Sequence, residues 1–276
     1  MIKKSGLKSL AKRIFGAQTG RSAITVITFT GGMGAQIISA AIYLSMKEAG
    51  QAVYADLSYF DRDVHLATPG KQGDCSHWPW QLDVFGLHRT SFETLQGYSK
   101  REVNLIEDGR EKLSLALKAM VQPEVQKYFA VPGNVDDILP PGTDPVYLCV
   151  HVRRGDYVNV ASHLVSDSEF VGLSAKFAGL VKSIVIVSDS PLEPAFRQQV
   201  SAGFEQAVFL DDIDAFGTHR VMRNARILVC SNSQFSLIGA MMNHQALAIM
   251  PKQWFGESHR ALEEPINEVC DFQILA

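Results

Sequence analysis

The stretch ITVITFTGGMGAQIISAAIYLSMKEAGQAVYADL, residues 24–57, predicts the fold. Residues 24–29 form an apolar, β-branched run typical of a buried strand, and the glycine-rich turn Gly31-Gly32-Met33-Gly34 ends it. A helical pattern follows over residues 35–49, with its apolar side chains mostly on one face, and residues 52–57 read as the next strand. A strand, a turn, a helix and a strand make a βαβ unit, and such units build parallel sheets.

A second series of strand-like runs begins beyond a segment rich in proline and glycine. The segment contains Pro132-Gly133, Pro140-Pro141-Gly142 and Pro145, and is typical of a domain junction. The runs that follow cover residues 146–152, 183–187, 207–210, 227–230 and 246–250, with helical stretches between them. We therefore predict an α/β fold of two Rossmann-like domains facing a cleft, over residues 21–143 and 144–276, after a separate segment 1–20.

The composition excludes several classes of protein. Apolar residues make up 46% of the 276 residues and charged residues 20%, an ordinary globular balance. A net charge of −3 and a pI near 6.2 argue against nucleic acid as a partner, because such proteins carry a basic surplus. The four cysteines show no CxxC spacing, so we expect neither a disulfide framework nor a zinc site, and the simplest setting is cytoplasmic.

The N-terminus carries a charge of the opposite sign. Residues 1–16 contain five lysines and arginines and no acid, which leaves −8 on the remainder of the chain. Their apolar residues recur at helical spacing, a pattern that suits a short helix lying on anionic lipid, at the inner face of the cytoplasmic membrane. A frayed basic terminus explains the pattern equally well. No apolar run is long enough to span a bilayer or to form a signal-peptide core.

The segment HVRRGDY, residues 151–157, carries the strongest chemical signal. A buried strand delivers His151 and then Arg153 and Arg154 to its carboxyl end, where open α/β sheets bind ligands. Arginine presents a rigid fork of donors that suits phosphate oxygens, so two of them would neutralise a departing pyrophosphate without a metal. The competing interpretation is structural: Arg154 pairs with Asp156 and fixes the loop.

Two further strand ends carry small polar residues. Residues 229–236, VCSNSQFS, lead into an apolar helix, and hydroxyls with free N–H groups at a helix N-terminus bind anions. Plain capping of that helix by Ser231 or Ser233 is compatible with this role. At the other strand end, Ser188-Asp189-Ser190 offers a carboxylate to a guanine edge or a ribose hydroxyl, or else only begins the next helix.

Other chemistries are weakly represented. The sequence contains no GxSxG, HExxH or Walker motif, and the glycine turn lacks the third glycine of GxGxxG because Ile37 stands there. Asp61-Arg62-Asp63 is one isolated DxD, a weak sign of a metal-dependent transferase. Trp78-Pro79-Trp80 offers a stacking surface for a sugar, although an anchor in the core is the commoner use of such residues.

Together these segments resemble glycosyltransferase family 11, the alpha-1,2-fucosyltransferases. His151–Tyr157 resembles the H-x-R-R-x-D-Y motif of that family, and its order and spacing relative to other motifs agree from about residue 26 to 256. The other matching segments are Gly31–Gln36, Tyr54–Phe60, Ser231–Ser236 and Pro251–Phe255. The chain departs from the family at Ala35, where asparagine is common, and at Leu237-Ile238, where the family has paired tryptophans.

The resemblance implies a GT-B-type fold and an inverting transfer of L-fucose from GDP-fucose to O-2 of a galactoside. It implies no metal and no cofactor, and an oligosaccharide or lipid-linked glycan as acceptor, in bacterial surface polysaccharide or O-antigen synthesis. The implied donor-binding residues are His151, Arg153, Arg154, Ser188, Asp189, Asn232, Ser233, Gln234, Phe235 and Ser236. Those implied to face the acceptor are Gly32, Gly34 and Gln36.

The resemblance implies that Arg153 would bind the β-phosphate and stabilise the leaving GDP, that Arg154 would support the pocket or its loop, and that Asp156 would order it. Arg153 and Asp156 are thus candidate catalytic residues, and His163 joins them because it follows the arginine loop closely. Either Asp156 or His163 would serve as the base that takes the proton of the acceptor hydroxyl, His163 because a histidine titrates near neutral pH. His151 is open to a second interpretation, as a packed histidine at a strand end. A different GDP-deoxysugar as donor, or a protein that binds a nucleotide sugar without turnover, are the alternatives.

Overall fold

The computed structural model describes residues 24–61, 78–159, 163–243, 247–251 and 273–274. The predicted basic segment 1–20 lies outside these residues, and so do Cys75, Cys270 and most of residues 251–255. The side chain of Asp156 is also outside the description. The predictions made for them stay predictions.

The N-terminal unit contains a parallel sheet of three strands in the order β2-β1-β3. Residues 24–57 form the predicted βαβ unit, so this part of the prediction is confirmed. Its strands are β1 (Thr25–Thr28), β2 (Val53–Asp56) and β3 (Asn104–Ile106), and its long helix is α2 (Met33–Glu48). The sequence did not predict β3, because three residues are too short a run to show a period.

Short helices complete this unit and lead out of it. They are η1 (Ser58–Asp61), η2 (Leu82–Phe85), η3 (Arg89–Ser91), α3 (Gly109–Met120), α4 (Pro123–Gln126), η4 (Lys127–Phe129) and η5 (Val135–Asp137). Helix α2 is buried on most of its circumference rather than on one face. It is surrounded by the first sheet, by α3 and α4, and by α8 (Gln234–Met241) of the second unit.

The C-terminal unit contains six parallel strands in the order β6-β5-β4-β7-β8-β9. Counted along the chain this is 3-2-1-4-5-6, the strand order of a Rossmann fold. The five predicted strands are all present: β4 (Tyr147–Val152), β5 (Ser183–Ser188), β6 (Gln206–Leu210), β7 (Ile227–Val229) and β8 (Leu247–Met250). The sixth strand, β9 (Gln273–Ile274), was not predicted. The helices are η6 (Gly155–Asn159), α5 (Asp167–Ala175), α6 (Pro194–Val200), α7 (Ala215–Asn224) and α8 (Gln234–Met241).

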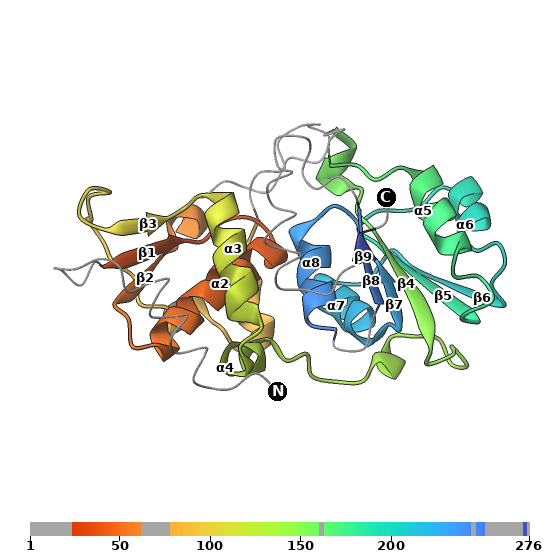
Figure 1. The fold of residues 1–276 in the computed structure, drawn as a ribbon, viewed down its shortest axis with the longest axis horizontal. Coiled ribbons are helices and arrows are strands. Elements are labelled where there is room, and N and C mark those ends of the chain that lie inside the picture. The colour runs from red at the N-terminus through yellow and green to blue at the C-terminus, as the bar shows by residue number, and fades with distance from the viewer. Residues whose placement is uncertain (1–23, 62–77, 160–162, 244–246, 252–272, 275–276) are drawn as a thin grey trace.

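Helices cover both faces of this second sheet (Figure 1). Along β4, Leu148, Val150 and Val152 point into an outer core that includes Phe170 of α5 and Phe196 of α6. Cys149, from the same strand, points into the main core with α7 and α8. Because both faces are buried, the strand reads as a continuous apolar run rather than an alternating one.

The main core continues from one unit into the other. It runs from the first sheet through Ile37 and Ile38 of α2, across Leu237 and Ile238 of α8, to the inner face of the second sheet. Figure 1 shows α7 and α8 lying between the two sheets. The predicted fold class, two Rossmann-like α/β units facing a cleft, is confirmed; the boundary at residue 143 stays a prediction.

Two cysteines lie within the described residues, Cys149 and Cys230, and both are buried in the core as free thiols. Among the helices of the described ranges, none is both long and apolar enough to cross a membrane.

Candidate functional site

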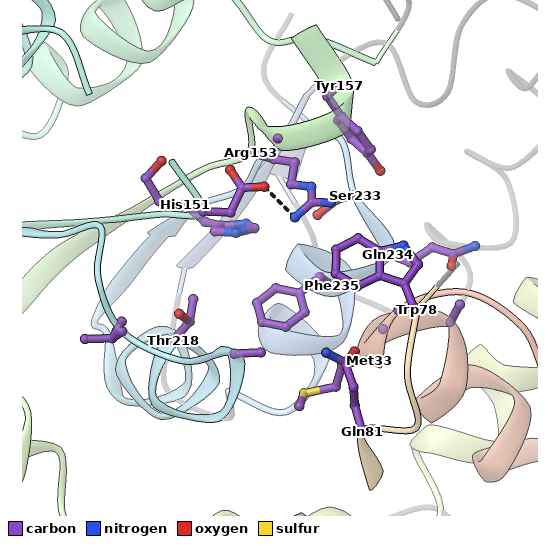
Figure 2. Close-up of a pocket in the computed structure, with 18 residues that line it drawn as sticks. Met33, Trp78, Gln81, His151, Arg153, Tyr157, Thr218, Ser233, Gln234 and Phe235 are labelled. Carbon is purple, nitrogen blue, oxygen red and sulfur yellow. Dashed lines mark ion pairs between the residues drawn. The ribbon is translucent and has the colours of Figure 1, made fainter. Parts of the chain in front are cut away.

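A cavity of about 550 Å³ lies between the two units (Figure 2). Its walls come from the turn after β1 and from the segments that follow β4, β5, β6 and β7. In the second sheet the strand order reverses between β4 and β7, and open α/β sheets bind ligands at such a switch point, outside the carboxyl ends of the strands. The fold therefore brings together segments as far apart in the chain as Gly32 and Phe235.

Two helices begin at this cavity. Helix α2 starts at Met33 after Gly32, which has no side chain to cap it, and α8 starts at Gln234 after Ser233. The helices meet almost backbone to backbone, since a Cβ on Gly34 would lie 2.6 Å from the nitrogen of Phe235. The positive ends of two helix dipoles therefore point toward one space, which favours an anion there.

Arg153 supplies a full positive charge at the same wall. Its Nη1 lies 2.5 Å from Oδ2 of Asp189, the ion pair dashed in Figure 2. Its guanidinium carbon lies 5.4 Å from the ring centroid of Trp78 and 5.2 Å from that of Tyr157. The side chain is 18% exposed, so the cation is held in place and still open to the cavity that it lines.

The loop that carries Arg153 is fixed from β5. Oδ1 of Asp189 accepts a hydrogen bond from the backbone N–H of Arg154 at 2.8 Å, and the hydroxyl of Ser190 accepts one from the N–H of Gly155 at 3.2 Å. Gly155 has φ +26°, and a Cβ there would lie 2.6 Å from Oδ2 of Asp189. Asp189, predicted to bind guanosine, therefore lines the cavity while anchoring Arg153.

Arg154 points away from the cavity. Its Nη1 donates to the carbonyl of Val165 at 2.8 Å, its Nη2 pairs with Asp167, and its guanidinium lies 5.6 Å from the ring centroid of Phe170. Arg154 was expected both to bind the donor and to support the pocket or its loop. The geometry corrects the first expectation, since Arg154 is outside the cavity lining, and the side chain instead ties the loop to the start of α5. The pairing proposed with Asp156 stays a prediction, because that side chain lies outside the description.

His151 is held by the serines of residues 231–236. Its Nδ1 lies 2.5 Å from Oγ of Ser236 and 3.1 Å from Oγ of Ser231, and the ring is 3% exposed. Burial, and then the positive charge of Arg153, lower the pKa of His151 to about 3, so the imidazole is neutral at physiological pH. A neutral ring with Nδ1 engaged leaves Nε2 for a ligand in the cavity that His151 lines.

The segment 231–236 divides into two roles. Ser233, Gln234 and Phe235 line the cavity, and Ser233 also caps α8 by accepting from the N–H of Ser236 at 3.1 Å. Asn232 and Ser236 are buried outside the lining, so the prediction that they touch the donor does not agree with their position. Ser233 therefore caps α8 and lines the cavity at once, and its contact with the donor stays a prediction.

On the acceptor side, Gly32 and Gly34 line the cavity and Gln36 does not. Gln36 is fully buried: its Nε2 donates to the carbonyls of Gly31 and Pro79, both at 2.8 Å, and its Oε1 accepts from the N–H of Gln81 at 2.9 Å. Both N–H groups and the oxygen of this amide make hydrogen bonds that join the glycine turn to residues 79–81. Gln36 therefore positions the segment that carries Trp78 instead of facing an acceptor.

The two tryptophans of Trp78-Pro79-Trp80 have different environments. Trp80 packs among Phe29, Phe60 and Phe92 and donates from its indole nitrogen to the carbonyl of Leu87 at 3.0 Å, so it is the core anchor. Trp78 lines the cavity. The anchoring role therefore belongs to Trp80, and stacking of a sugar on Trp78 stays a prediction.

The general base stays unassigned. His163 lies outside the cavity lining, with its ring edge-to-face against Tyr157 at 5.3 Å between centroids. Asp156 lies in η6, one residue from Tyr157. His151 is a poor base because of its low pKa.

Several lining residues had no signal in the sequence. Ile213, Ala215 and Thr218 reach the cavity from the turn after β6 and the start of α7, and Gln81 from the first unit. Apolar and small side chains such as these carry no chemical motif, and only the fold brings them to the site. Tyr157 was within the recognised motif, although its contact with Arg153 was not foreseen.

Within the described ranges, no three histidine, cysteine or acidic side chains cluster as a metal site would require. That the chemistry needs no metal stays a prediction.

No protein-family model matches the chain, and no curated protein matches it. Its fold is similar to solved structures of low sequence identity. E. coli heptosyltransferase WaaC with ADP is 14% identical with a TM-score of 0.41, covering 82% of this chain and 86% of that one. POFUT1 in complex with GDP-fucose is 12% identical with a TM-score of 0.43, covering 83% and 96%. A family 9 glycosyl transferase from Veillonella parvula is 9% identical with a TM-score of 0.43, covering 84% and 82%. Similarities at this level do not identify a function.

Proposed function

We propose that this protein is an inverting glycosyltransferase that binds a nucleoside diphosphate sugar, GDP-fucose, without a metal. The observation that carries the proposal is the position of Arg153. It stands at the cavity wall, fixed by Asp189 and two aromatic rings, where the N-termini of α2 and α8 converge.

A diphosphate is the ligand that these charges favour. A helix N-terminus behaves as roughly half a positive charge. Arg153 adds donors matched to phosphate oxygens and a positive charge that the carboxylate of Asp189 partly offsets. The neutral His151 adds a hydrogen-bonding group and no charge. A charged hydrogen bond to a phosphate oxygen contributes about 1.5–3 kcal/mol, so Arg153 alone accounts for a large part of the affinity for an anion.

The chemistry follows from where negative charge appears. The bond between the anomeric carbon and the β-phosphate oxygen breaks, and its electron pair leaves with the diphosphate. An acceptor oxygen bonds to that carbon from the opposite face, and its proton passes to a base. Arg153 and the helix N-termini stabilise the developing charge because they are oriented before the reaction begins.

The identity of the sugar and the acceptor rests on the resemblance of residues 151–157 and 231–236 to the alpha-1,2-fucosyltransferases. We propose transfer to O-2 of a galactoside in a surface glycan, with another GDP-deoxysugar as the alternative donor. Contact of residues 1–16 with the inner face of the cytoplasmic membrane belongs to the same proposal and would bring the enzyme to a lipid-linked acceptor.

Two adjacent arginines provide the test. The purified protein is titrated in EDTA against GDP, UDP, GDP-fucose and GDP-mannose by calorimetry, as wild type, Arg153→Ala and Arg154→Ala. We expect selective binding of GDP and GDP-fucose, weakened more than tenfold by Arg153→Ala, since that change removes a charged hydrogen bond. Arg154→Ala is expected to lower the melting temperature more and the affinity less, because its guanidinium holds Val165 and Asp167.

Preference for UDP, or binding only after a divalent cation is added, would contradict the proposal. Equal binding of GDP and GDP-fucose, with no consumption of the sugar nucleotide when galactosides are offered, would indicate a binding protein. Equal effects of the two arginine variants on affinity would show that the loop, rather than Arg153, carries the site.

A further inference from the structure

Trp78 lies across the boundary between the two units. It belongs to the N-terminal unit by sequence, yet its ring centroid is 5.4 Å from the guanidinium of Arg153, which follows β4 of the other unit. Figure 2 shows the indole of Trp78 and the side chain of Arg153 among the residues that line the cavity. Arg153 is thus held between Tyr157 of its own loop and Trp78 of the opposite unit.

The backbone around Trp78 is fixed at three points. The N–H of Trp78 donates to the hydroxyl of Tyr59 at 3.0 Å, and Gln36 binds both the carbonyl of Pro79 and the N–H of Gln81. The start of α2 is bare under the ring, since a Cβ on Gly32 would lie 3.3 Å from the indole. A buried amide and a glycine therefore determine where this ring lies.

We infer that Trp78 is a positioning residue that orients Arg153 toward the diphosphate. Anion binding by the C-terminal unit therefore depends on how the N-terminal unit packs against it. The inference rests on the proposed function for its substrate, a diphosphate, and goes beyond it in assigning a role to the unit opposite. A cation over an indole gains about 0.5–2 kcal/mol, according to how far it is desolvated. That range corresponds to about two- to thirtyfold in affinity.

The test uses inorganic pyrophosphate as the probe, because it engages Arg153 without a base or a sugar. The chain has three tryptophans, two of which lie in the described residues. Of these two, Trp78 is the one that contacts Arg153. In the wild type we expect a saturable change in tryptophan emission as pyrophosphate is added. In Trp78→Phe the change disappears while calorimetry still gives an affinity within about threefold of wild type, because a ring remains over the guanidinium.

Trp78→Ala removes the ring and is expected to weaken pyrophosphate about tenfold, with a melting temperature close to that of Trp78→Phe. With a sugar nucleotide that is turned over, kcat should fall more than KM rises, since Arg153 contributes most as the leaving charge develops. Arg153→Ala is the reference, and should abolish both the binding and the emission change.

Wild-type affinity and emission response in Trp78→Ala would overturn the inference, as would wild-type protein that binds no pyrophosphate. The two proposals separate cleanly. Pyrophosphate binding that depends on Trp78, with no sugar nucleotide consumed, would refute the proposed transferase and leave the positioning role standing. Sugar transfer that is unaffected by Trp78→Ala would do the reverse.

Discussion

Replacing Gly34 by alanine tests the contact on which the site depends. An added Cβ would lie 2.6 Å from the nitrogen of Phe235, 2.8 Å from its Cα and 2.8 Å from the carbonyl carbon of Gln234. Carbon atoms pack at about 3.5–4.0 Å, so the two helix starts must separate by roughly 1 Å. All three atoms are backbone, and no side chain can rotate away to relieve the clash.

The cost has a stability part and a functional part. Overpacking costs about 1–3 kcal/mol, and the better helix propensity of alanine offsets up to about 1 kcal/mol of it. A net loss of about 1–2 kcal/mol corresponds to a drop of roughly 2–8 °C in melting temperature for a chain of this size. The first turns of α2 and α8 line the cavity, and a displacement of about 1 Å reduces a catalytic rate by as much as a hundredfold.

Gly172 in α5 is the matched control, because a Cβ there meets nothing within 4 Å. Gly172→Ala should melt at or above the wild-type temperature, and its rate of transfer should be unchanged. Gly34→Ala should bind GDP more weakly and transfer more slowly at a temperature where it is fully folded. If Gly34→Ala matched Gly172→Ala in both melting and rate, α2 and α8 would not be in backbone contact and the geometry of the cavity would be wrong.

Three further changes test single parts of the site. Gly155→Ala places a Cβ 2.6 Å from Oδ2 of Asp189 and so disturbs the carboxylate that holds Arg153. We expect the affinity for GDP, measured by calorimetry, to fall about tenfold, and an unchanged affinity would argue against that anchor. Gln36→Leu leaves two carbonyls and one N–H without their partner, and should cost about 3 kcal/mol in denaturant unfolding; a variant as stable as wild type would contradict the role assigned to this amide. Because the folded pKa of His151 is about 3 and the ordinary value is 6.5, unfolding takes up a proton between these pH values, so stability falls as pH decreases through that window by up to about 1.4 kcal/mol per unit. The free energy of unfolding of wild type should fall with decreasing pH from 7 to 4 more steeply than that of His151→Asn, by the slope that corresponds to one proton. Parallel pH dependences of the two proteins would show that the ring titrates normally.

Much of the architecture follows from the sequence. Residues 24–57 predicted a βαβ unit because a continuous apolar, β-branched run, a glycine turn and a helix of period 3.6 leave separate patterns in a short window. The five longer strands of the second sheet were predicted for the same reason. Strands β3 and β9 were missed, since two or three residues carry too little pattern, and pairing with a neighbouring strand is what makes them strands.

The chemistry of the site was partly visible as well. His151, Arg153, Asp189 and Ser233 stand at strand ends, and the rule that ligands bind there is enough to group them. The local pattern does not distinguish the two adjacent arginines, because a loop directs each side chain independently of its neighbour; the resemblance assigned Arg153 to the phosphate and Arg154 to support of the pocket or its loop. The contacts of each side chain decide which arginine lines the cavity: Arg154 is held by Val165 and Asp167, and Arg153 by Asp189.

The sequence by itself therefore determined the order of strands and helices and the residue types available for binding an anion, because both depend on local pattern. Only the tertiary structure decided the strand order 3-2-1-4-5-6, the backbone contact of Gly34 with Phe235 and the stacking of Trp78 on Arg153. The physical reason is range. Residues 34 and 235, or 78 and 153, meet through the packing of two units around one core, and no periodicity within either segment records that contact.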